Sequence, residues 1–389
     1  MAAFAKTLQL GDVIRFGNGK AIKPGGEGRH PVYGSNGIIG GCDEFRYENG
    51  VIIGRVGAYC GSVAYCPDKF WASDNTLVAF PATEQIDTRF LFYLLTDAKL
   101  SRYAGGAAQP LVTQTVLKQV EVLVPPLPIQ RRIAAILSAY DELIENSQRR
   151  IKILEAMARG LYREWFVHFR FPGHESVPLV TSPLGEIPEG WEVRNVKDIA
   201  KVTYGFPFAS KKFNTDGIGT PVIRIRDIPQ GFTPTFTEEV AEPKYRVKNG
   251  HILVGMDGDF HMCIWSSGHA FQNQRVARFE SNDEIGNLHL FLSLERPIQE
   301  FNKAIVGTTV SHLGDMHVKT IQILWPPARL RAEGRAMLEP MSEQIIALRR
   351  QIQNLRRTRD LLLPRLLTGQ IALETLPGLS AEEQDSCLS

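Results

Sequence analysis

Cysteines are few in this sequence, and an early membrane-length apolar run is missing. Five cysteines occur in 389 residues, an odd number without a CxxC pair, at Cys42, Cys60, Cys66, Cys263 and Cys387. This spacing fits neither a disulfide framework nor a zinc ribbon, and it predicts buried or unreactive thiols. Charges at Lys6, Asp12 and Arg15 interrupt the early segment "MAAFAKTLQLGDVIRF", which argues against a signal-peptide core or an early membrane span. We therefore expect a cytoplasmic protein without membrane association.

The usual catalytic motifs are also missing. The sequence contains no GxxxxGK[ST], GxGxxG, HExxH or GxSxG motif and no Cys/His cluster with metal-ligand spacing. "VPPL" and "WPPA" share their prolines with the Asn/Asp-Pro-Pro-aromatic motif of amino-methyltransferases, but Val124 and Trp325 cannot hold an exocyclic amine. Asp257 and Asp259 in "MDGDF" lack the acidic neighbours of a cation site, so a turn is the preferred interpretation. We predict a chain without a catalytic centre, metal or cofactor of its own.

The sequence does contain an internal repeat. "NG" at 49–50 recurs at 249–250, Phe80 corresponds to Phe279, and Val124 corresponds to Trp325, at offsets of 200, 199 and 201. Three anchors within two residues of one offset indicate two copies of one unit, over about 1–170 and 188–370.

The front part of each copy is predicted to be a β-rich globule. Short β-branched and aromatic runs alternate with Gly, Pro, Asn and Asp: "NGVIIGRVG", "GSVAYC", "NTLVAF" and "QVEVLV" in the first copy, and "HILVGM", "CIWSS", "RVARF" and "TIQILW" in the second. One helix interrupts each set, "DTRFLFYLLTDAKLSRY" or "NLHLFLSLERPIQEFNKAI". The pattern predicts two α+β domains.

The back part of each copy has apolar residues at alternating spacings of four and three, which is typical of a coiled-coil seam. A single long core helix is the alternative, but the remaining positions are rich in arginine and lysine, such as Arg149 and Arg350. Two matching seams most simply pair with each other. Ser147, Gly334 and Arg359 interrupt the pattern. The predicted seam residues are Ile133, Leu137, Tyr140, Ile144, Ile151, Leu154, Leu161 and Trp165, and Leu338, Met341, Ile345, Leu348, Ile352, Leu355, Leu362 and Leu366.

Two prolines affect the second helix. Pro340 is expected in its first turn, which would make 329–339 a separate short segment. Pro364 is expected to kink or end the helix, before "TGQ" at 368–370 supplies a glycine stop.

The predicted fold is α+β, with two β-rich globules related by the internal repeat and joined by two long antiparallel coiled-coil helices in a pseudo-twofold arrangement. The predicted segments are a first domain at 1–128, a central helix at 129–170, a linker at 171–187, a second domain at 188–328, a distal helix at 329–370, and a polar, disordered tail at 371–389.

Loops of both globules carry side chains suited to nucleic acid. Arg, Asn and Gln read guanine and adenine edges, whereas Ser, Thr and backbone amides hold phosphates. Any single residue of this kind is more often part of a turn, and the net charge of +2 does not by itself indicate DNA. Recurrence in corresponding loops of both copies favours function. The candidates are Arg29, Tyr33, Ser35, Asn36, Arg55, Tyr59, Ser73, Asn75, Gln109 and Thr113, and Arg224, Arg226, Asp259, His261, Gln274, Arg275, Thr308, Thr309 and His312.

The order of these elements closely resembles the specificity subunit of type I restriction-modification enzymes. "PPLPIQRRI" at 125–133 and "PLGEIPEGW" at 183–191 are similar to the family's boundary sequences, and "YGSNGIIG", "GRVGAYCGSVAY", "NQRV" and "TTVSHL" to its target-recognition domains. The resemblance covers the chain to about residue 372. "PPARLRAEGRAML" departs from it, because the family's Gln-rich helix start is altered there.

The resemblance implies a non-catalytic DNA-recognition subunit of a methyltransferase and endonuclease complex that serves phage defence. Each target-recognition domain would read one half of a split, asymmetric site in double-stranded DNA. Ile133 to Trp165 and Leu338 to Leu366 would set the gap between the halves and dock two methyltransferase (M) subunits, which methylate adenine; two restriction (R) subunits complete the enzyme. S-adenosylmethionine, ATP and Mg²⁺ are then expected on the partners, and the isolated chain is expected to bind DNA weakly.

Two other functions stay open. A specificity subunit of a type IIB-like enzyme differs only in its partner. A coiled-coil scaffold with two peptide-binding modules would have no DNA site. A methyltransferase in its own right is disfavoured by the missing cofactor motifs.

Overall fold

The computed structural model describes residues 5–23, 25–106, 109–282, 284–305, 312–371 and 373. The chain divides into two compact units, one formed by Met1–Leu143 with Leu355–Ser389 and the other by Ile144–Asn354. Each unit contains one β-rich domain and parts of both long helices. Each long helix therefore contributes to both units.

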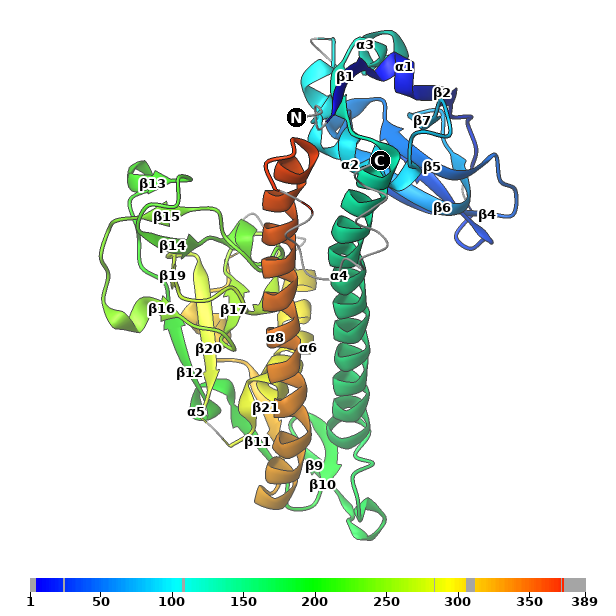
Figure 1. The fold of residues 1–389 in the computed structure, drawn as a ribbon. Helices are drawn as coiled ribbons and strands as arrows, with labels where there is room; N and C mark the ends of the chain where they lie inside the picture. Colours follow the sequence, from blue (N-terminus) through cyan, green and yellow to red (C-terminus); the bar gives the residue numbers. More distant parts are fainter. Residues whose placement is uncertain are drawn as a thin grey trace. The chain divides into compact units, whose positions relative to one another are not determined.

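The first unit contains a six-stranded sheet in the order β2-β7-β5-β6-β3-β4. Its strands pair antiparallel except β3 and β6, which are parallel. Helix α2 packs against the sheet (Figure 1). The elements are β1 (Lys6–Gln9), α1 (Leu10–Val13), β2 (Ile14–Asn18), β3 (His30–Gly34), β4 (Gly37–Cys42), β5 (Tyr47–Gly54), β6 (Val63–Ala72), β7 (Thr76–Pro81), α2 (Thr88–Asp97), α3 (Gln114–Lys118) and β8 (Glu121–Val124), where β1 pairs with β8.

The β-rich domain of the second unit has a four-stranded sheet, β12-β20-β17-β18, and a five-stranded sheet, β13-β15-β14-β19-β16. The remaining strands form the pairs β10-β9 and β11-β21. The elements are β9 (Leu179–Ser182), β10 (Gly185–Pro188), β11 (Glu192–Asn195), α5 (Val196–Ile199), β12 (Ala200–Tyr204), β13 (Phe213–Asn214), β14 (Thr220–Ile223), β15 (Phe236–Thr237), β16 (Arg246–Val247), β17 (Ile252–Gly255), β18 (Met262–Ile264), β19 (Ala270–Gln272), β20 (Val276–Ser281), α6 (Gly286–Ile305), α7 (Asp315–Val318) and β21 (Gln322–Trp325).

The central strand of each domain is buried on both faces, which explains its continuous apolar sequence. Val51 and Ile53 of β5 lie in the core with α2, whereas Ile52 points into a separate cluster around Phe70. Successive side chains of a strand point to opposite faces. Strand β17 repeats this division with Ile252 and Val254 on one face and Leu253 on the other. The α+β repeat expected from the sequence is thus present in both domains.

Two long helices complete the units: α4 (Leu127–Tyr162), which continues into a π-helical turn at Arg163–Val167, and α8 (Ala328–Leu367) (Figure 1). In the first unit Leu137, near the start of α4, shares a core with Leu366, near the end of α8. In the second unit Ala158, near the end of α4, shares a cluster with Leu338, near the start of α8. The helices therefore run antiparallel within each unit, and every predicted seam residue is buried or half-buried.

The prediction of a separate segment at 329–339 is wrong, because α8 is continuous from Ala328 to Leu367. Both Pro340 and Pro364 lie on the exposed face of the helix, where the carbonyl that loses its hydrogen-bond donor can bind water. Pro364 does not end the helix, which continues three residues further to Leu367. Gly369 follows with a φ of 71°, as expected for a glycine stop.

Two interruptions of the seam have structural reasons. Arg359 of α8 forms an ion pair with Asp141 of α4, with Nη1 2.5 Å from Oδ1. The other carboxylate oxygen of Asp141 accepts a hydrogen bond from the hydroxyl of Tyr93 in α2 at 2.5 Å. Gly334 leaves room for Phe166, because a Cβ there would lie 2.8 Å from the ring. Each interruption therefore marks a close contact of α8 that a standard apolar residue would not allow.

Described residues of the segments predicted as linker and tail take part in the fold. Residues in the linker form the β9–β10 hairpin, and Phe171 and Ile187 pack with Trp191. Ile371 and Leu373 of the predicted tail pack against the core of the first domain. The rest of the tail lies outside the described residues.

Candidate nucleic-acid interface

The same backbone hydrogen bonds hold one turn in each β-rich domain. In the first domain the turn 73–75 connects β6 to β7, and Arg55 N donates to Asn75 O at 2.9 Å while Val112 N donates to Arg55 O at 3.0 Å. In the second domain the turn 273–275 connects β19 to β20, and the corresponding donors and acceptors are Met256 N to Arg275 O at 2.9 Å and Leu313 N to Met256 O at 2.7 Å. The candidate loops of both domains thus share one backbone framework.

Isolated β-bridges extend this framework at the repeat offset. Val56 pairs with Leu111 in the first domain, and Asp257 pairs with His312 in the second. Each bridge brings the loop after the central strand beside the segment that precedes α3 or α7. The backbone is therefore repeated, whereas Asn75, Val56 and Leu111 of the first domain are replaced by Arg275, Asp257 and His312 in the second.

In the first domain the framework gathers several predicted residues at one edge. Ser35 Oγ donates to Asn75 O at 2.8 Å, and Ser62 Oγ donates to Ser35 O at 2.5 Å. Gly57 N donates to Pro110 O at 3.1 Å, which brings the loop after Arg55 beside the exposed Gln109. The side chains of Asn36, Tyr59 and Asn75 are exposed. Arg55, Asn75 and the loop at 109–110 therefore form the candidate contact surface of this domain, and the Ser35 hydroxyl supports the turn that carries Asn75.

Other predicted residues of the first domain serve its fold. Tyr33 is buried against Phe70, and Ser73 is buried within its turn. Thr113 caps α3, because its hydroxyl accepts a hydrogen bond from Val116 N at 3.3 Å. Arg29 lies in an exposed loop, with its Nε 3.7 Å from an oxygen of Asp43. We leave Tyr33, Ser73 and Thr113 out of the proposed contact set.

In the second domain the framework assembles a polar cluster of Asp257, Arg275 and His312. Arg275 Nε lies 3.2 Å from Asp257 Oδ2, and His312 Nδ1 lies 2.5 Å from Asp257 Oδ1. Gln274 is exposed beside this cluster, as are Asp259 and His261 in the neighbouring loop. The sequence had suggested Arg275 and His312 but assigned Asp257 to a turn. Asp257 and Arg275 are separated in the sequence, and the fold brings their opposite charges together.

The remaining candidates of the second domain lie elsewhere. Arg224 is half-buried and hydrogen-bonds Thr235, with its Nε 3.8 Å from Asp227, whereas Arg226 is exposed. Thr308 and Thr309 lie outside the described residues. Only His312 of the predicted "GTTVSH" group can therefore be placed.

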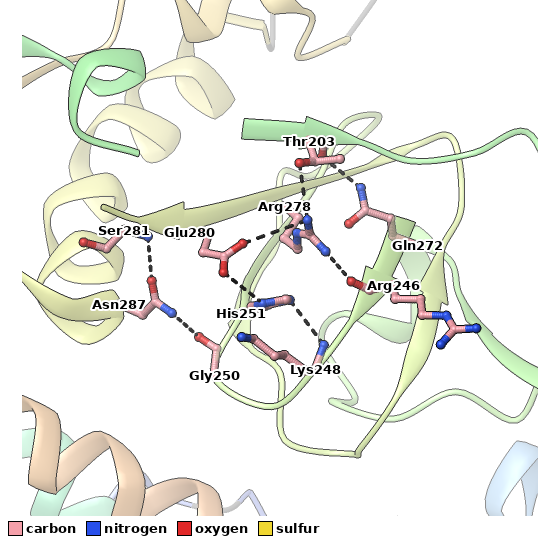
Figure 2. Close-up of polar contacts among 10 residues, drawn as sticks. All are labelled: Thr203, Arg246, Lys248, Gly250, His251, Gln272, Arg278, Glu280, Ser281 and Asn287. Carbon is pink, nitrogen blue, oxygen red and sulfur yellow. Dashed lines mark hydrogen bonds and ion pairs between the residues drawn. The ribbon is translucent and has the colours of Figure 1, made fainter. Parts of the chain in front are cut away.

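A buried polar cluster connects the two sheets of the second domain, with Gln272 and Arg278 on either side of the turn 273–275 in the sequence (Figure 2). Arg278 of β20 donates to Arg246 O of β16 and, at 3.4 Å, to Thr203 Oγ1 of β12. Gln272 of β19 donates to Thr203 O at 2.8 Å. Because β12 and β20 belong to one sheet and β16 and β19 to the other, these bonds restrict movement of the turn that connects β19 to β20.

His251 completes this cluster as a neutral side chain. Burial, and then the positive charge of Arg278, lower the pKa of His251 to about 4. Its Nδ1 accepts a hydrogen bond from Lys248 N at 3.2 Å, and its Nε2 lies 3.5 Å from Glu280. We therefore assign the cluster a structural role at neutral pH.

Within the described part of the chain, no group of three or more His, Cys, Asp or Glu side chains could hold a metal ion. Among the helices of that part, none is long and apolar enough to cross a membrane.

Comparison with known proteins supports the same interpretation. The family model for the type I restriction modification DNA specificity domain matches twice, at residues 5–156 and 188–355. The type I restriction enzyme MjaIX specificity subunit of Methanocaldococcus jannaschii is 27% identical over 351 residues, which cover 85% of this chain and 79% of that protein. The EcoBI specificity subunit of Escherichia coli is 30% identical over 211 residues, covering 53% of this chain and 44% of its own.

A solved structure shows the same fold. The crystal structure of the type I restriction-modification S subunit from M. genitalium matches with a TM-score of 0.66 at 16% identity, covering 97% of this chain and 98% of that one. The α+β prediction and the resemblance to specificity subunits are confirmed by these matches. With two copies of its domain model along most of the sequence, the chain belongs to the type I restriction-modification DNA specificity family.

Proposed function

We propose that this chain is a non-catalytic DNA-recognition subunit that reads a bipartite, asymmetric site. The observation that carries the proposal is the repeated backbone framework, which presents Asn75 in the first domain and Arg275 in the second. Two domains with one backbone but different side chains would bind DNA in similar ways and select different bases.

The asymmetry of the site follows from the side chains at corresponding positions. Val56 and Leu111 in the first domain correspond to Asp257 and His312 in the second. An apolar pair cannot replace a carboxylate and an imidazole in hydrogen bonding to base edges. The two half-sites would therefore differ in sequence.

The long helices would set the gap between the half-sites and dock the partner subunits. Ile153 and Met157 of α4 are 58% and 52% exposed, and they lie on one face because they are four residues apart. Large apolar side chains on an exposed helix face indicate a protein-binding surface. We propose that methyltransferase subunits cover this face and that restriction subunits complete the enzyme. The partner subunits would then bind S-adenosylmethionine, ATP and Mg²⁺, and the complex would work in the cytoplasm.

The test is selection from random DNA duplexes by the full chain assembled with its adenine methyltransferase. Two short half-sites separated by a constant gap are expected. Inserting one heptad in both long helices should change the gap and leave each half-site unchanged, whereas replacing one heptad at equal length should leave the gap unchanged as well. An unchanged gap after the insertion would contradict the ruler role, and a selection without any DNA motif would favour a protein-binding scaffold.

A type IIB-like enzyme differs only in its partner. Purification of the chain with its native partners tests this alternative. A partner polypeptide that carries both methylation and cleavage activity would support it, whereas separate M and R subunits would support the type I assembly.

A further inference from the structure

The guanidinium of Arg275 is fixed by its neighbours before any DNA binds. Asp257 Oδ2 holds the Nε side of the guanidinium at 3.2 Å. His312 Nδ1 lies 2.5 Å from the other oxygen of Asp257 and 3.3 Å from Arg275 Nη1. A protonated Nδ1 that donates to Asp257 cannot also accept a hydrogen bond from Arg275. This tautomer leaves the Nη1 and Nη2 groups of Arg275 available to a ligand.

The backbone under Arg275 is fixed as well. Arg275 O accepts a hydrogen bond from Met256 N at 2.9 Å, and Val276 N closes the turn by donating to Asn273 O at 2.9 Å. Asp257 and His312 are themselves joined by a β-bridge. Fewer rotamers are therefore lost when this arginine binds, which favours affinity and specificity.

We propose that Arg275, held by Asp257, reads a guanine in the half-site bound by the second domain; this inference rests on the DNA-recognition function proposed above. Two adjacent N–H groups of an arginine match the O6 and N7 acceptors of guanine in the major groove. An arginine positioned by a carboxylate on its Nε side presents that pair of donors in one orientation.

A phosphate contact is the main alternative, and the charges argue against it. Asp257 and Arg275 form an ion pair, and their side chains are 36% and 51% exposed. The pair carries little net charge because its two charges are opposite. A phosphate site depends on net positive charge and counterion release, and the carboxylate of Asp257 would repel the phosphate. A base edge has no net charge, so it is compatible with the pair.

The first domain provides an internal comparison. Asn75 occupies the position of Arg275 in the framework, and Val56 occupies that of Asp257. The carboxylate that positions an arginine is thus present where the arginine is present and replaced by valine where the side chain is an amide. This correlation within one chain supports a positioning role for Asp257.

The test uses the complete complex with the methyltransferase and a random-duplex selection read out by adenine methylation. The wild type is expected to enrich guanine at one position of one half-site. Arg275→Ala should reduce that preference about tenfold to a hundredfold at this position only. Arg275→Lys should reduce the preference less than Arg275→Ala, because lysine also contacts guanine O6 and N7 but lacks the planar pair of donors that Asp257 orients. Asp257→Asn should weaken the same preference, and Asn75→Ala should alter only the other half-site.

Arg296→Ala is the matched control, because Arg296 is an exposed arginine of α6 that pairs only with Glu300 among the described residues. It should leave every preference unchanged. The inference is overturned if Arg275→Ala keeps the guanine preference. It is also overturned if that variant weakens binding equally for all sequences and lowers the salt dependence, as loss of a phosphate contact would. A wild-type selection without a bipartite motif overturns the proposed function itself, and the inference with it.

Discussion

Removing the carboxylate of Asp141 should loosen the attachment of α2 and α8 in the first unit. Asp141 accepts the hydroxyl of Tyr93 at 2.5 Å and pairs with Arg359 at 2.5 Å. Tyr93 is 3% exposed, and the side chains of Asp141 and Arg359 are each 29% exposed. Burial, and then the hydrogen bond to Asp141, raise the pKa of Tyr93, so its hydroxyl stays protonated and donates.

The magnitude follows from these contacts. A hydrogen bond from a buried hydroxyl to a carboxylate contributes about 1.5–3 kcal/mol. Breaking a half-buried ion pair costs more than the ~0–1 kcal/mol of an exposed pair, because the remaining charge is left without its partner. We expect Asp141→Ala to lower the free energy of unfolding by about 3 kcal/mol, and Tyr93→Phe or Arg359→Ala to lower it by about 1–2 kcal/mol each. The double variants should show that Asp141 couples to both partners by about 1 kcal/mol or more.

Hydrogen exchange of α2 and of residues 355–367 is the local assay, because opening of these segments reports their own stability. Arg89 and Glu142 provide a matched control on the same two helices, α2 and α4: their side chains are 40% and 64% exposed, at 3.4 Å. Their substitution should change protection little. Equal effects at the control pair and at Asp141, or no coupling between Asp141 and Arg359, would refute the reasoning.

Two further predictions concern contacts of the second unit, each with its own control substitution. Gly334→Ala should lower the free energy of unfolding by about 1–2 kcal/mol, measured by thermal unfolding, because its Cβ would lie 2.8 Å from the enclosed ring of Phe166. The control is Gly160→Ala, which has open space around it and should raise the free energy of unfolding by up to about 1 kcal/mol. Burial lowers the pKa of His289 from 6.5 to about 3, so only the unfolded chain takes up this proton as the pH falls below 6.5. Stability should then decrease by about 1.4 kcal/mol per pH unit between about pH 6 and 4. His289→Leu should remove this slope, whereas substitution of the exposed His269 by leucine should leave it unchanged. An unchanged slope in His289→Leu would show that His289 does not cause the pH dependence.

The sequence was most informative where local pattern and long-range packing agree. The apolar run of β5 and its copy in β17 predicted buried strands, and the spacing of four and three predicted the helix seam. Both patterns depend on residues close in sequence, whose burial follows from the period of the element. The repeat offset then related the two domains without any structural information.

The sequence could not supply a residue's role where that role depends on a distant partner. Arg359 interrupts the seam because its guanidinium forms an ion pair with Asp141, which is far away in sequence. Tyr33 resembles a binding residue in its glycine-rich loop, but the parallel pairing of β3 with β6 turns its ring into the core. Pro340 has the sequence properties of a helix start, and only the exposed face of α8 makes it compatible with a continuous helix.

The repeated framework also separates residues that hold the turns from residues that, under the proposed function, would read DNA. Backbone hydrogen bonds such as Met256 N to Arg275 O are independent of the side chain at position 275. The Ser35 hydroxyl, in contrast, donates to Asn75 O and is therefore part of the support. Replacement of Ser35 by alanine should lower stability, whereas replacement of Asn75 or Arg275 should leave stability nearly unchanged and alter the selected DNA. If the chain reads two half-sites as proposed, recognition and folding would depend on different groups, and the specificity of each half-site would change by substitution at a single position without loss of the fold.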